Sequence, residues 1–309
     1  MTSLSRAPEQ ALTYVGGKSP LTEPIEALPE NEALLFLKTL AKQLSRGPLE
    51  LPSFPNVVIK VREALQHSDA SIEKIVTLVG SEPLLAARLL KTANSVAFNP
   101  SNKRVSELRS VVTRLGYQVV QAAAVAFAIQ QMKEEAKLRP IARPLAELWK
   151  NSINVASLCQ IIARRVKVNP DEAFLTGLLH GVGRLYILVQ AASSSASVRE
   201  KLATADFVTD WHPSIGKAVL ENWQVGDAIA LAVNDQGDLN RAAKRYPDLT
   251  DVLIVSIFLE KALSTQAPRV MPAADFESFR RVNLTAGDCA VVLRQAEYQL
   301  ASLQEALGC

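Results

Sequence analysis

Residues able to bind a metal or to perform acid–base chemistry are few in this chain of 309 residues. Its histidines and cysteines number three each: His67, His180, His212, Cys159, Cys289 and Cys309. Their spacing supports neither a zinc cluster nor a cysteine–histidine dyad. Glycine-rich phosphate loops of the Walker and dinucleotide types do not occur, nor does the Gly-x-Ser-x-Gly elbow of hydrolases. Metal chemistry therefore depends first on the surroundings of His180.

His180 ends an apolar helix in the segment FLTGLLHGVGRLYI. A histidine at a helix C-terminus is often structural, because it can cap carbonyl groups and its charged form suits the negative helix end. As a metal ligand, His180 would need a carboxylate beside it, and the next residue is Gly181. We interpret Gly181 and Gly183 as allowing a tight turn between two helices. His67 lies at a polar helix end and is expected to face solvent.

A second candidate site is a cluster of basic residues between positions 88 and 114. Few acidic residues offset it, and its members are Arg88, Lys91, Lys103, Arg104, Arg109 and Arg114. One interpretation is a solvated helix face. The other is a docking patch for an acidic partner, or a pocket for a phosphate-bearing signal nucleotide. Aromatic residues suited to base stacking are sparse there, so we do not expect sequence-specific nucleic-acid binding.

The bulk composition favours a water-soluble protein. Hydrophobic residues make up 48% and charged residues 21%, and the net charge of +3 implies no general attraction to nucleic acid. The odd number of widely spaced cysteines suggests a reducing compartment. We find no apolar run of the roughly 18 residues needed to cross a bilayer, and no signal-peptide core. The chain is expected to be cytoplasmic, without a membrane partner.

The elements that must position these residues are helices. Apolar residues recur at helical spacing from Glu32 onward, and strand-like alternation is almost absent, which predicts an all-α fold. Residues 1–30 have little periodicity and are expected to form a disordered, protease-sensitive tail. The proline-containing stretch 133–144 divides the rest into an N-terminal helical subdomain, residues 31–140, and an HD-like subdomain with C-terminal helices, residues 141–309.

Helix boundaries can be predicted from capping residues. Ser71 and Asn169 should cap helices, the latter with proline at the first helical position. Ser81 should cap the helix that contains Pro83. Gly116 should end the helix that follows residue 106. The polar stretch 234–248 is expected to be a loop before two or three C-terminal helices.

Several motifs, in order, resemble those of the HDOD family (HD-related output domain) of bacterial signalling proteins. They are LPSFPNVVIKVREAL, DASIEKIVTLVGSEPLLAARLLKTANSVAF, SELRSVVTRLG, LLHGVGRL and DWHPSIGKAVLENWQVGDAIALAV. Each motif alone is weak, but together they cover roughly residues 51–235 at plausible spacing. The resemblance implies two helical subdomains related to the HD superfamily, whose phosphohydrolases bind divalent metals through histidine and aspartate.

The resemblance also implies that the metal site has degenerated. The first ligand histidine of the family aligns with Asn151, and the paired aspartate aligns with Gly181. The later histidine pair aligns with Asn234-Asp235-Gln236, and the final aspartate aligns with Leu259. His180 and His212 remain, and two imidazoles without a carboxylate suit Mg²⁺ or Mn²⁺ poorly. We therefore expect no metal and no cofactor.

The resemblance implies a non-catalytic signalling module that acts as a regulatory scaffold through protein–protein contacts. HDOD proteins are often joined to, or encoded near, response regulators and proteins of cyclic-di-GMP signalling, and such a protein is the expected partner. Two alternatives stay open. One is a divergent metal-dependent phosphohydrolase. The other is a sensor that binds a nucleotide in the former active-site cleft.

Overall fold

The computed structural model describes residues 32–44, 61, 64, 71–134, 136–196, 198–199, 202, 206–223, 225–239, 241–242, 245–264 and 276–307. All regular elements in these ranges are helices, which confirms the all-α prediction. In chain order they are α1 (Glu32–Leu44), α3 (Ile72–Gly80), α4 (Pro83–Ala93), α5 (Leu108–Glu134), the 3-10 helix η1 (Ala136–Ile141), α6 (Ala142–Val166), α7 (Pro170–Leu179), α8 (Val182–Ala191), α10 (Asp206–Asn222), α11 (Asp227–Asn234), α12 (Leu249–Ser264), α13 (Glu277–Val282) and α14 (Ala286–Leu307). The expected tail, residues 1–30, and His67 lie outside the described residues.

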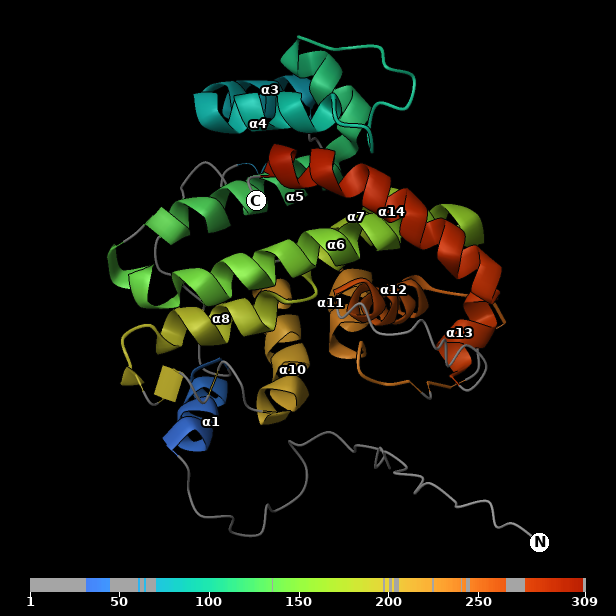
Figure 1. Ribbon diagram of the computed structural model, residues 1–309. Coiled ribbons are helices and arrows are strands. Elements are labelled where there is room, and N and C mark those ends of the chain that lie inside the picture. The colour runs from blue at the N-terminus through green and yellow to red at the C-terminus, as the bar shows by residue number, and fades with distance from the viewer. Residues whose placement is uncertain are drawn as a thin grey trace, which may run out of the picture.

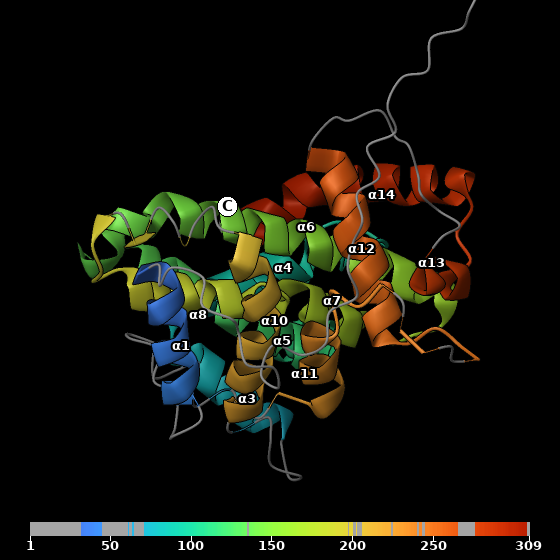
Figure 2. The ribbon, with the colours of Figure 1, turned by 90° about the horizontal axis from the view of Figure 1, so that it is seen from below.

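Helix α6 crosses the middle of the molecule, and the other elements surround it (Figure 1). From Ser152 to Ala163, every residue except Asn154 is buried. The helix packs against α7, α8, α12, α14 and η1. Helices α3 and α4 lie on one side of it, and α8, α10 and α1 lie on the other (Figures 1 and 2). Because the stretch Ser152–Ala163 has almost no solvent-facing side, it contacts neighbours in nearly every direction, and this part of α6 sets their positions.

Capping residues explain where several helices begin. The Ser71 side chain accepts a hydrogen bond from the backbone nitrogen of Lys74 (3.1 Å). The Asn169 side chain accepts from the next turn of α7. The expectation for Ser81 is wrong: Glu82 is the N-cap of α4, and the Ser81 hydroxyl donates to the Leu78 carbonyl at the end of α3 (2.7 Å).

Gly116 interrupts α5, at the position where the sequence predicted the end of the helix that follows residue 106. Its backbone has φ +72° and ψ 166°, which side chains other than hydrogen rarely allow. The helical path resumes directly afterwards, so α5 is two helical segments joined at a kink.

Two helical stretches correct the expectation that no segment has the length and composition of a membrane span. Leu108–Ala128 and Pro170–Ala191 meet both criteria, since shorter apolar helices follow one another with almost no interruption at Gly116 and at Gly181. They are, however, 67% and 89% buried inside the protein. Both are core helices by their packing.

The C-terminal helix α14 spans the two subdomains predicted from the sequence. It packs against α4 and α6, and in Figure 1 it runs from below α4 down toward α13. Near its end, the Leu307 carbonyl accepts hydrogen bonds from the Arg88 guanidinium of α4 and the Trp149 indole of α6, each at 3.4 Å. The division at residues 140 and 141 stays a prediction, but α14 fastens the parts on either side of it to each other.

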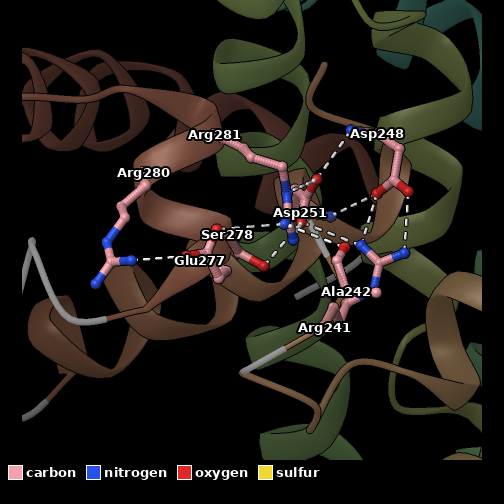
Figure 3. A network of polar contacts seen from close by, with 8 residues as sticks. All are labelled: Arg241, Ala242, Asp248, Asp251, Glu277, Ser278, Arg280 and Arg281. Carbon is pink, nitrogen blue, oxygen red and sulfur yellow. Dashed lines mark hydrogen bonds and ion pairs between the residues drawn. The ribbon is translucent and has the colours of Figure 1, made fainter. Parts of the chain in front are cut away.

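A buried ion network anchors the chain before α12 and the helix α13 to α12 (Figure 3). At its centre the Asp251 carboxylate, fully buried, accepts hydrogen bonds from Arg281 (2.7 and 2.9 Å) and Ser278 (2.8 Å). Arg241 pairs with both oxygens of Asp248 (2.8 and 2.9 Å) and also reaches Asp251 (3.1 Å). From the sequence, residues 234–248 were expected only to be a polar loop, and no local pattern indicated this network.

Replacing Asp251 with asparagine should lower the free energy of unfolding by about 3 kcal/mol, because two arginines then lose their shared buried counter-charge. Urea-induced unfolding of the purified chain measures this. The control is Glu147→Gln, which breaks an exposed i,i+4 pair with Arg143 and should change stability by less than about 0.5 kcal/mol. Equal effects of the two substitutions would contradict a stabilising role for the network.

Candidate functional site

His180 is placed by α7 and serves a structural role there. Its residue follows the last turn of α7, and its side chain is buried with 7% exposure. The imidazole Nδ1 lies 2.7 Å from the Gly177 carbonyl oxygen, one turn earlier. Since a carbonyl only accepts, Nδ1 carries the proton and donates. One ring nitrogen of His180 is therefore already used in a hydrogen bond to its own helix.

The backbone of His180 is also held in place. Gln236, just beyond α11, donates from its side-chain amide to the carbonyls of His180 (3.1 Å) and Val233 (2.7 Å). Gln236 belongs to the segment that the resemblance aligned with a histidine pair. In this chain, it supports the backbone at His180. The other two residues of that segment, Asn234 and Asp235, hydrogen-bond each other (2.8 Å).

His212 lies on α10 and is buried with 6% exposure. Its Nδ1 has no hydrogen-bond partner in the part of the chain that the structure describes. It is close enough to His180 and to Arg184 for both to lower its pKa, although burial is the largest cause. Burial likewise lowers the pKa of His180 to about 4. Both imidazoles are neutral at physiological pH.

Two glycines, Gly181 and Gly183, lie where α7 is followed by α8. Gly181 has φ −90° and ψ 6°, a conformation open to other residues. At Gly183, an added Cβ would lie 1.9 Å from the His212 carbonyl oxygen and 2.7 Å from the Gly216 nitrogen. Helices α8 and α10 thus cross backbone to backbone at Gly183. The expected turn between the two helices is present at His180 and Gly181. Gly183 lies inside α8, and close helix packing is the reason for it.

The space beside Gly181 is apolar. A small pocket there is lined by Val125, Leu145, Leu148, Trp149, Ser152, Leu178, Leu179, Gly181, Val182 and Leu185. An added Cβ on Gly181 would approach the Leu148 side chain to 2.9 Å. The Ser152 hydroxyl would lie 3.4 Å from the same Cβ. The position that a carboxylate occupies in the HD motif therefore faces mainly aliphatic side chains and one hydroxyl, which would stabilise a charge poorly.

Asn151 belongs to a different cluster, between α6 and α12. Its side chain hydrogen-bonds the Glu260 carboxylate, which also accepts from Asn154 (3.3 Å), and Gln304 of α14 donates to Asn154 (3.1 Å). Burial raises the pKa of Glu260, and the bonds from Asn154 and Asn151 oppose that rise. The aligned residue Leu259 is fully buried in the core. Sequence reasoning missed Glu260, although it is an isolated acid in an apolar helix.

These donors do not fit the divalent metal ion of the HD superfamily. No group of three or more histidine, cysteine, aspartate or glutamate side chains with metal-binding proximity occurs among the described residues. His180 uses Nδ1 for a carbonyl, and the buried carboxylate nearest to an aligned ligand position is bonded to amide groups. Hard divalent ions require several oxygen ligands, which His180 and His212 do not supply.

The predicted basic patch divides into three kinds of residue. Arg88 and Arg114 are half-buried and donate to backbone carbonyls, Arg88 also lying over the Phe127 ring. Lys91 forms an ion pair with Glu305 (2.8 Å), and Arg109 forms one with Glu73. Lys103 and Arg104 are exposed in the segment before α5. A docking patch here would therefore centre on Lys103 and Arg104.

The family assignment follows from comparison with known sequences. The model of the HDOD domain family matches residues 51–239, more than half of the chain. The chain belongs to this family. An uncharacterized protein from Treponema pallidum is 21% identical over 251 residues, which are 75% of this chain and 46% of that protein. This chain thus spans less than half the length of that curated relative.

Solved structures show the same fold. An HDOD domain protein of unknown function from Geobacter sulfurreducens superposes with a TM-score of 0.56 at 19% identity, covering 87% of this chain and 96% of that one. A protein from Shewanella amazonensis, whose name proposes metal-dependent phosphohydrolase activity, gives a TM-score of 0.64 at 23% identity, covering 88% and 99%. The similarity confirms the architecture expected from the HDOD motifs.

Acidification should destabilise the protein through His180. Its pKa is about 4 in the folded chain and 6.5 in the reference state. The unfolded chain therefore binds more protons between these values, so stability is full above pH 6.5 and falls as pH drops toward 4, by up to about 3 kcal/mol. The test is urea unfolding of the wild type and His180→Gln across this range. The difference between them should shrink as pH falls, and a constant difference would contradict the linkage.

Proposed function

We propose that this HDOD protein is a non-catalytic regulatory module that works through protein–protein contacts. The observation that carries the proposal is what the residues at the aligned ligand positions contact in this chain. His180 is bonded to the Gly177 carbonyl, and Asn151 is bonded to Glu260. These contacts contribute to the packing of α6, α7 and α12. Phosphoryl chemistry on a metal requires an open coordination sphere with charged ligands, and these residues do not supply one.

A divergent phosphohydrolase is the second candidate, and one observation favours it. Glu260 places a buried carboxylate beside Asn151, at the helix where the family has its last ligand. The name of the Shewanella amazonensis protein points to the same activity for that protein. Against this candidate, the amide groups of Asn151 and Asn154 donate hydrogen bonds to Glu260. These bonds stabilise the carboxylate without a metal cation.

Purified protein should contain no stoichiometric transition metal and should not hydrolyse phosphodiesters in added Mn²⁺ or Mg²⁺. Elemental analysis after mild dialysis and a phosphodiesterase assay measure this. His180 and His212 would at most hold Ni²⁺ or Zn²⁺ weakly and adventitiously. Gly181→Asp should also stay inactive, because the other ligands remain absent. About one metal per chain, with turnover abolished by His180→Ala and by Glu260→Gln, would establish the enzyme instead.

The partner is proposed to be a protein with an acidic surface, such as a response regulator or a cyclic-di-GMP-signalling protein. Lys103 and Arg104 are the part of the basic patch that is most available to it, since both are exposed. Lys91 and Arg109 already have acidic neighbours. Charges at the rim of an interface act mainly on the association rate and on its salt dependence.

Charge reversal at Lys103 and Arg104 together, to glutamate, should weaken partner binding about tenfold while leaving the melting temperature nearly unchanged. The measurement is affinity capture with tagged protein from the native bacterium, followed by titration of each protein that the wild type enriches. The control is Arg143→Glu, another exposed arginine. Capture that is unchanged by the double variant, or equally weakened by the control, would remove this patch from the proposal.

A further inference from the structure

Arg184 is a cation with no counter-charge among the side chains that the structure describes. It lies in the first turn of α8 and is half-buried, and its guanidinium donates to the Thr209 hydroxyl (3.0 Å). Among the side chains that the structure describes, no carboxylate forms an ion pair with it. Arg241 and Arg281 differ sharply, because each is bonded to buried or half-buried aspartates. A desolvated charge without a partner is costly, and a bound anion would offset that cost.

The crossing of α8 and α10 gathers further hydrogen-bonding groups around Arg184. Thr209 and His212 are three residues apart on α10 and so lie on one face of that helix. That face meets α8 at Gly183, where the His212 carbonyl lies against the glycine. His212 is more than nine-tenths buried, and its Nδ1 is without a partner in the described part of the chain. His180 stands one helical turn before Arg184.

We propose that Arg184, Thr209 and His212 form a binding site for a phosphate group, either free phosphate or the phosphate of a nucleotide. The guanidinium supplies a forked pair of charged donors, which suits phosphate oxygens. The Thr209 hydroxyl accepts from Arg184 and still has its own proton to donate. Neutral imidazole at His212 can donate from Nδ1. The charge of the site comes from the permanent charge of the Arg184 guanidinium, and its three residues include no carboxylate.

The inference does not depend on a protein partner, so it can fail while the proposed scaffold function stands. It also gives the nucleotide-sensor alternative a defined location. The site lies on the α8–α10 side of His180, away from the apolar pocket next to Gly181. None of its three residues belongs to the basic patch around Lys103 and Arg104, so the two surfaces can be tested separately.

The test is thermal unfolding of the full chain in increasing inorganic phosphate, against sodium chloride at equal ionic strength. A ligand that binds only the native state raises the unfolding midpoint in a saturable way. We expect this for the wild type and for the control Arg143→Gln, and about tenfold weaker binding for Arg184→Gln. Without phosphate, Arg184→Gln should unfold at the same or a higher temperature, since an uncompensated buried charge is gone.

Further ligands identify the source of the phosphate, and a second variant is available if the first does not fold. GMP that binds tighter than phosphate, while guanosine has no effect, would indicate a nucleotide. Equal effects of GMP and phosphate would indicate free phosphate. If Arg184→Gln does not fold, Thr209→Val replaces it, because Thr209 is exposed and its loss should also weaken binding. A wild type that responds equally to phosphate and chloride, or a response that survives Arg184→Gln or Thr209→Val unchanged, would overturn the site.

Discussion

The arrangement of this protein depends on burying the stretch Ser152–Ala163 of helix α6 on nearly all of its sides. A helix in that position must present small groups where other backbones approach and must find partners for its polar side chains. The backbones of α6 and α7 approach closely at Ala156 and Gly177: a Cβ added to Gly177 would lie 2.6 Å from the Ala156 Cα. Asn154 provides an example of the second requirement, because α12 and α14 supply Glu260 and Gln304 to its amide. The packing of α6 thus determines which residues of α7, α12 and α14 meet.

The same constraint explains what became of the HD-type positions. Asn151 faces the side of α6 that α12 covers, so its amide is used to solvate Glu260. His180 ends α7, whose close approach to α6 buries the imidazole and keeps it neutral. An uncharged ring that donates to its own helix stabilises the fold, whereas a metal ligand would need a carboxylate that Gly181 cannot provide. At both positions, the contacts that the structure shows are made to the protein itself.

The residues beyond the family match are part of the same structure. The HDOD match ends at residue 239, yet α12 and α14 contact α6, and α14 also reaches α4. The Asp251 network holds the chain before α12 and helix α13 together (Figure 3). Because a buried carboxylate shared by two arginines is favourable only in one geometry, this network specifies how the C-terminal helices return to α6.

The sequence by itself determined the helical class, many helix ends and the family. These depend on local signals: apolar residues at helical spacing, Ser71 and Asn169 as caps, Gly116 as a break, and the HDOD motifs in order. Tertiary structure alone decided which side chains share a neighbourhood. Asn151 meets Glu260, not the neighbouring Leu259, because the rotation of α12 relative to α6 is set by packing, and a shift of one residue along a helix turns a side chain by about 100°. Gly183 could be explained only once α10 was known to lie against it, because that contact joins residues far apart in the chain.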